Sequence, residues 1–109
     1  KPNYYHSLKT IYDSEHKKYF INHNFLDKKN FWSDVFNNYF RVLSKENNFI
    51  LTQLNFDDLR KEDGYIWIIC PQDISIENCE KIRSKKLINF KVSKNINFSN
   101  VNVKLVKLK

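Results

Sequence analysis

A stripe of large apolar side chains recurs at helical spacing in the middle of the chain. Spacings of three and four residues place such side chains on one face of a helix. Asp27 precedes the stripe and is a suitable N-cap. An aromatic stripe at helical spacing usually packs in a core, so we expect a core helix and not an exposed platform. The stripe consists of Phe31, Trp32, Val35, Phe36, Tyr39, Phe40 and Leu43.

A shorter helical pattern occupies the N-terminal residues. The apolar spacing is interrupted by polar residues after Tyr12 and returns at Tyr19, and Asp13-Ser14 either continues the helix or caps a second one. We expect the helical run to end at residues 22–24, because Asn side chains bond their own backbone. The apolar positions are Tyr5, Leu8, Ile11, Tyr12, Tyr19 and Phe20.

The pattern changes after residue 48. Residues 49–52 predict a short strand, and Asn55 is a suitable cap for a brief helix that ends at Gly64. The only glycine of the chain is expected at a positive φ. Residues 65–70 read as a buried strand, which Pro71 ends.

The last third predicts a helix followed by alternating strands. Ser75 can cap the helix, and apolar and polar residues then alternate over residues 87–92 and 96–105. A one-residue slip near Ser99-Asn100 indicates a bulge or a turn. Because Asn and Lys occupy the other face, we expect an antiparallel sheet that is solvated on one side.

These elements predict an α+β fold. A helical N-terminal half would pack on a small, mainly antiparallel sheet formed by the C-terminal half. With 109 residues, the chain has room for one core, so residues 1–109 are expected to form a single domain. The longest apolar run, residues 66–70, is far shorter than the roughly 20 residues of a membrane span. We therefore expect no membrane span.

The composition weakens the usual interpretation of a basic chain. The chain has no alanine but 15 asparagines, 16 lysines and 11 isoleucines, a bias that AT-rich codons explain. Lysine can therefore fill generic surface positions, and the net charge of +7 does not by itself predict an anionic partner.

The distribution of charge is more informative than its sum. Residues 81–109 hold eight lysines, one arginine and no carboxylate, so this stretch carries +9 and the rest is slightly acidic. Strand alternation predicts that Lys91 and Lys104 project to the solvated face with Asn89 and Asn102. The alternative is a solvated face or an edge that lysine protects from aggregation. The candidate binding residues are Arg83, Lys86, Lys91, Lys94, Lys104 and Lys107.

No catalytic or metal-binding motif is present in the sequence. His6, His16 and His23 lack the spacing of a zinc site, and a single glycine excludes phosphate-binding glycine loops. Neighbouring carboxylates such as Asp57-Asp58 lie beside basic residues, where caps and surface ion pairs explain them. We therefore expect a protein that is not an enzyme and that has no cofactor and no metal.

The two cysteines, Cys70 and Cys79, allow either a disulfide or two buried thiols. A bridge would close a short loop and contribute about 2–3 kcal/mol on the chain-entropy model.

Two segments resemble known families. Residues 31–36 with Tyr39-Phe40 resemble the Phe-Trp signature of BSD domains, which implies an all-helical module; the strand-rich second half departs from it. Residues 62–71 with Cys79 are similar to the Cys-Pro…Cys stretch of six-cysteine surface domains. That resemblance implies a β-sandwich with further cysteines, which this chain lacks. We assign the chain to neither family.

We therefore expect a non-catalytic protein-interaction domain or accessory subunit whose partner is another, acidic protein. The alternative is a nucleic-acid-binding module that uses the basic sheet face, and steep salt dependence would distinguish it. If the basic face is only solvated surface, the partner should bind the helical half around Tyr4, Tyr5 and Tyr19-Phe20.

Overall fold

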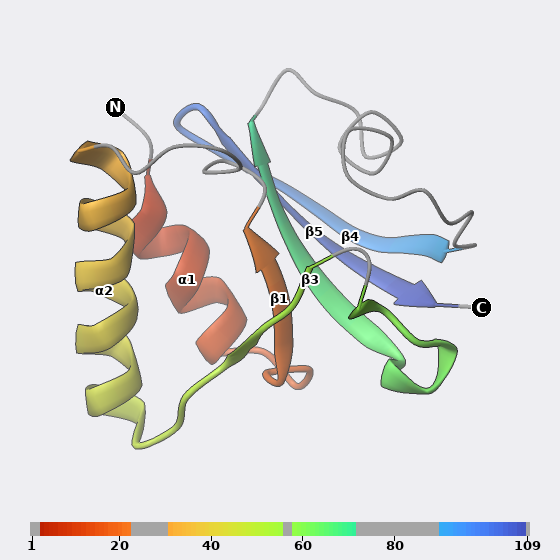
Figure 1. Ribbon diagram of the computed structural model, residues 1–109. Coiled ribbons are helices and arrows are strands. Elements are labelled where there is room, and N and C mark those ends of the chain that lie inside the picture. The colour runs from red at the N-terminus through yellow and green to blue at the C-terminus, as the bar shows by residue number, and fades with distance from the viewer. Residues whose placement is uncertain (1–2, 23–30, 56–57, 72–89, 109) are drawn as a thin grey trace.

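In the part of the chain that the structure describes, two α-helices and a five-stranded mixed sheet form the fold, and both helices come from the N-terminal half (Figure 1). The computed structural model describes residues 3–22, 31–55, 58–71 and 90–108. The predicted α+β class is confirmed. In chain order the elements are α1 (Tyr4–Tyr12), β1 (Tyr19–Asn22), α2 (Phe31–Asn47), β2 (Thr52–Gln53), η2 (Lys61–Asp63), β3 (Tyr65–Pro71), β4 (Phe90–Phe98) and β5 (Val101–Leu108).

The strand order across the sheet is β2-β1-β3-β5-β4. β1 runs parallel to both β2 and β3, whereas β5 is antiparallel to β3 and to β4. The antiparallel part is therefore the C-terminal part, as predicted, and β4 and β2 are the two edges. The Cα radius of gyration is 13.0 Å, which is about the value expected for one compact domain of this length.

The helices cover one face of the sheet, which we call the helix-side face, and the main core lies beneath them. Leu8 and Ile11 of α1 and Phe36 and Leu43 of α2 are buried there against Trp67 of β3. Edge-to-face aromatic contacts join α1 to α2, such as Tyr4 to Phe36 with ring centroids 5.6 Å apart. The aromatic stripe of α2 is thus core where its side chains are described, and the side chains of Phe31 and Trp32 lie outside that part.

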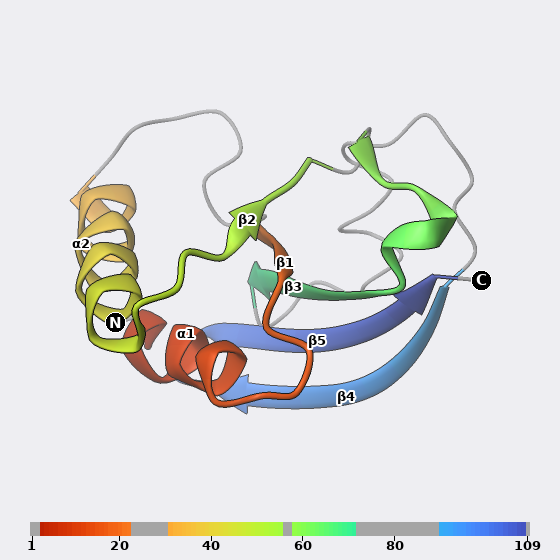
Figure 2. The ribbon, with the colours of Figure 1, turned by 90° about the horizontal axis from the view of Figure 1, so that it is seen from below.

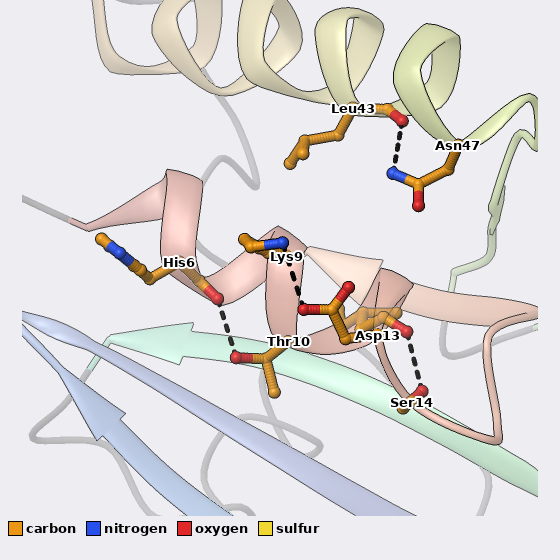
Figure 3. Close-up of polar contacts among 8 residues, drawn as sticks. His6, Lys9, Thr10, Asp13, Ser14, Leu43 and Asn47 are labelled. Carbon is orange, nitrogen blue, oxygen red and sulfur yellow. Dashed lines mark hydrogen bonds and ion pairs between the residues drawn. The ribbon is translucent and has the colours of Figure 1, made fainter.

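The helix ends are fixed by local polar contacts (Figure 3). Asp13 is the C-cap of α1, so Asp13-Ser14 neither extends this helix nor begins another. The Ser14 hydroxyl donates to the Ile11 carbonyl (2.7 Å) and accepts from the Trp67 indole N–H (3.2 Å). In α2, the Asn47 amide donates to the Leu43 carbonyl (2.8 Å).

The predicted helical continuation through Tyr19 and Phe20 is wrong, because these residues form β1. Phe20 is fully buried under α2, and in the sheet it pairs with Trp67 of the neighbouring strand β3. Its partners are therefore distant in sequence, and adjacent aromatics do not show whether a segment is helix or strand. The predicted strand at 49–52 is misplaced, because β2 comprises only Thr52 and Gln53, which pair with β1, and residues 49–51 are not in a strand.

Several local predictions are confirmed. Residues 65–71 form strand β3, in which the side chains of residues 66–70 are buried. Gly64 has a φ of 75°, and the slip at Ser99-Asn100 is a turn with Asn100 at a φ of 58°. The sequence left a disulfide and a buried thiol open for Cys70; its side chain is fully buried and its sulfur is in a disulfide. The predictions for Asp27, Ser75, Cys79 and Asn89 lie outside the described residues.

The sheet is not solvated along the whole of one side, contrary to our expectation. A second core cluster lies on the face opposite the helices, and Leu54, Leu59 and Phe90 pack against it. The central strands β3 and β5 therefore bury side chains on both faces, whereas the two edge strands, β4 and β2, are largely exposed. The buried members of the second cluster are Ile21, Ile66, Ile68, Cys70, Val106 and Leu108.

Candidate functional site

β4 and β5 form an antiparallel hairpin (Figure 2), and four of the candidate lysines, Lys91, Lys94, Lys104 and Lys107, lie on it. A bulge between Val92 and Lys94 shifts the pairing by one residue. Because paired residues share a face, Lys91 and Lys94 both project to the helix-side face. The same bulge lets Phe90 face the second core cluster, whereas Phe98 packs against the main core.

Lys104 does not belong with these lysines, which corrects our prediction. It pairs with Asn95 and Ile68, so it faces away from the helices, and it is only 8% exposed. Asn102 is on the same side and is 2% exposed, so neither residue lies on a solvated face. The alternation was correct for β5 itself, but the opposite face of this strand is buried.

A polar cluster holds Lys104 in that buried position. Its ammonium donates to the side-chain oxygens of Asn102 and of Asn95, the latter at 3.2 Å. The Asn102 amide nitrogen in turn donates to the side-chain oxygens of Asn95 (2.5 Å) and Asn97 (2.7 Å). These contacts satisfy buried polar groups, and Lys104 is therefore a structural residue in this fold.

The other three candidate lysines that the structure describes form one exposed cluster, which we call the lysine surface: Lys91, Lys94 and Lys107. Lys91 lies directly opposite Lys107 on the neighbouring strand, and Lys94 lies opposite Leu105. All three are exposed. Within the part of the chain that the structure describes, no carboxylate lies within ion-pair distance of any of them.

Tyr65 borders the lysine surface on β3. The Lys107 ammonium lies 5.6 Å from the centre of the Tyr65 ring, a cation–π contact. His16 stacks on the same ring with centroids 3.9 Å apart. The Tyr65 ring thus contacts both His16 and the Lys107 ammonium. Arg83 and Lys86, the other candidate residues, lie outside the described part of the chain.

The four aromatic residues that we considered as an alternative binding surface on the helical half are buried or partly buried. Tyr4 and Phe20 are buried in the main core at 3% and 0% exposure. Tyr5 packs edge-to-face on Tyr39, with centroids 5.7 Å apart. Tyr19 is half-buried beneath the Lys18 ammonium. The aromatic residues at these positions therefore serve packing.

A groove that the sequence analysis missed lies beside the C-terminal half of α2; we call it the α2 groove. Its volume is about 800 Å³, and it is open to solvent on one side. The signal for it was present, since Phe49 and Ile50 form an apolar pair directly after a helix, but we assigned them to a strand. The lining residues are Asn37, Phe40, Arg41, Ser44, Lys45, Asn48, Phe49 and Ile50.

The described residues show no grouping that would hold a metal ion. No cluster of three or more His, Cys, Asp or Glu side chains occurs among them. The His6 ring nitrogen contacts the Asn3 side chain at 3.0 Å, and one Asp63 carboxylate oxygen accepts the Arg60 backbone N–H at 2.9 Å. No helix in the described ranges is long and apolar enough to cross a membrane.

Comparison with known proteins identifies no relative of this chain. No protein-family model, no curated protein and no solved structure matches the chain. The resemblances to BSD domains and to six-cysteine surface domains thus gain no support, and the function must be argued from the surfaces of this chain.

Proposed function

We propose that this domain is a non-catalytic interaction module that binds an acidic protein partner through the lysine surface. The observation that carries the proposal is the direct cross-strand placement of Lys91 and Lys107. Like charges directly opposite each other destabilise a sheet. A partner that supplies carboxylates would offset this repulsion. Lysines that serve only solubility need not be placed directly opposite each other.

The exposure of the three lysines supports the same proposal. Exposed ammonium groups lose little hydration when they contact carboxylates at the rim of an interface, and they accelerate encounter with an acidic protein. A nucleic-acid partner is less well supported. The Tyr65 ring is already stacked on His16, and single-stranded nucleic acids need free aromatic faces for their bases.

Charge reversal on the lysine surface should abolish most of the binding to an acidic probe. The variant carries Lys91→Glu, Lys94→Glu and Lys107→Glu together, and the probe is a fluorescent oligoglutamate peptide followed by anisotropy. Each exposed contact contributes roughly 0.5–1 kcal/mol, so we expect affinity to fall by about 10- to 100-fold. Stability should change little, because these side chains are exposed.

The matched control reverses three exposed charges outside both the lysine surface and α2: Lys17, Lys18 and Arg60, each to Glu. It changes the net charge equally and should reduce affinity for oligoglutamate no more than about threefold. An equal loss in both variants would overturn the proposal, since binding would then follow net charge alone. Tighter binding of single-stranded DNA than of oligoglutamate at the same salt would favour the nucleic-acid module instead.

A further inference from the structure

The α2 groove is created by the way α2 ends. Asn48 adopts a left-handed φ of 49°, and its backbone N–H donates to the Lys45 carbonyl (3.3 Å). The Phe49 N–H donates to the Ser44 carbonyl (3.1 Å). This pair of hydrogen bonds is the Schellman motif, which reverses the chain at a helix C-terminus. Phe49 and Ile50 consequently line the same groove as Arg41 and Lys45 on the flank of α2.

The groove exposes apolar side chains that the core does not use. Phe49 is 39% exposed and Ile50 is 73% exposed, although the next residue, Leu51, is 2% exposed. Phe40 adds an aromatic wall that is partly buried on the main core. Contiguous exposed apolar surface with a polar rim is typical of an interaction site. The open shape and the volume of about 800 Å³ fit a peptide segment.

The charge along the groove identifies the chemistry of its occupant. Among the described residues that line it, Arg41 and Lys45 are the charged ones, and none is a carboxylate. The Arg41 guanidinium donates to the Asn38 side-chain oxygen (2.6 Å), which holds it on the helix surface. A guanidinium in a fixed position is well suited to bind a carboxylate through paired hydrogen bonds.

We propose that the α2 groove binds a short amphipathic segment of a partner protein that carries both apolar and acidic side chains. Its apolar side chains pack on Phe49 and Ile50, and its carboxylates bind Arg41 and Lys45. A second copy docked groove to groove is a poor occupant, because it would place its own Arg41 and Lys45 against these two cations. This site is separate from the lysine surface and does not depend on it.

Residue-resolved NMR with two synthetic peptides tests the proposal. One peptide has Leu and Glu at helical spacing, and the other has Lys in place of every Glu. We expect the acidic peptide to shift the resonances of Phe49, Ile50 and Arg41, and to bind at least about tenfold more tightly than the basic peptide. A purely ionic contact would instead shift Lys91 and Lys107, so the two sites are read separately.

Two variants make the assignment specific. Ile50→Asp should weaken the acidic peptide by at least about tenfold, whereas Val92→Asp, which changes a similarly exposed residue on β4, should leave it unchanged. Combining Arg41→Glu with Lys45→Glu should reverse the preference toward the basic peptide. Circular dichroism confirms that each variant is folded.

Three outcomes would overturn the proposal. The first is the absence of shifts at Phe49 and Ile50 at millimolar peptide. The second is equal affinity for the two peptides, which would mean that Arg41 and Lys45 do not select the occupant. The third is self-association that Ile50→Asp abolishes, because the groove would then belong to a second copy of the chain. None of them changes the result expected for oligoglutamate on the lysine surface.

Discussion

Replacing Trp67 with alanine should lower the free energy of unfolding by about 3–5 kcal/mol, the cost of removing a large aromatic side chain from a packed core. Trp67 is fully buried at the centre of β3, where it contributes to the main core beneath both helices. Its indole N–H also donates to the Ser14 hydroxyl, so the alanine variant loses a long-range polar link to the end of α1. Small domains are stable by about 5–15 kcal/mol, so the variant should be close to unfolding at ambient temperature.

Urea unfolding followed by circular dichroism measures this change. Trp67→Phe is the matched control, because it keeps an aromatic ring and removes the hydrogen bond to Ser14. We expect Trp67→Phe to retain more than half of the stability that Trp67→Ala loses. An alanine variant with a midpoint close to that of the native chain would contradict the burial of Trp67 and the position of the main core.

The second large effect is expected at Asn102, on the opposite face of the sheet. Asn102→Ala should cost about 2–3 kcal/mol, because the buried Lys104 ammonium loses an acceptor in a site with little access to water. The substitution also leaves the side-chain oxygens of Asn95 and Asn97 without their amide donor.

Asn97→Ala is the control for Asn102→Ala, because Asn97 belongs to the same cluster but is exposed to solvent. Its loss should cost about 1 kcal/mol or less, since water replaces the missing group. Equal costs for the two alanine variants in urea unfolding would show that the cluster is solvated and that Lys104 is a surface residue after all.

The helices and β3 could be predicted from the sequence because their signals are local. The spacing of Phe36, Tyr39 and Leu43 belongs to one helix face, and the apolar run before Pro71 indicates a buried strand without knowledge of its neighbours. β1 could not be predicted in the same way. Its four residues become a strand because Phe20 and Ile21 pair with β3 nearly fifty residues later, and such pairing leaves no periodicity in a short segment.

The candidate binding residues show the same limit. Alternation predicted which β5 residues share a face, but the bulge at Val92 and Lys94 depends on cross-strand register. Lys91 therefore joins Lys107 on the helix-side face and is separated from Lys104. The α2 groove depends on the left-handed conformation of Asn48. The sequence does not show which of its 15 asparagines adopts this conformation.

The central claim is that Lys91 and Lys107 are placed opposite each other for binding, at a cost to stability. Lys91→Glu separates these two effects, because it puts a carboxylate opposite the Lys107 ammonium. We expect it to stabilise the fold by roughly 0.2–1 kcal/mol while it removes one contact to an acidic partner. A fold that is more stable but binds less tightly is the signature of a surface kept for function.

The most direct test is therefore the dissociation constant of the oligoglutamate peptide for the native chain and for Lys91→Glu, measured by anisotropy in the same low-salt buffer. The account predicts affinity lower by about three- to tenfold in Lys91→Glu, with no loss of stability in urea. Equal affinity for the two chains would contradict it, because the lysine surface would then be ordinary solvated surface.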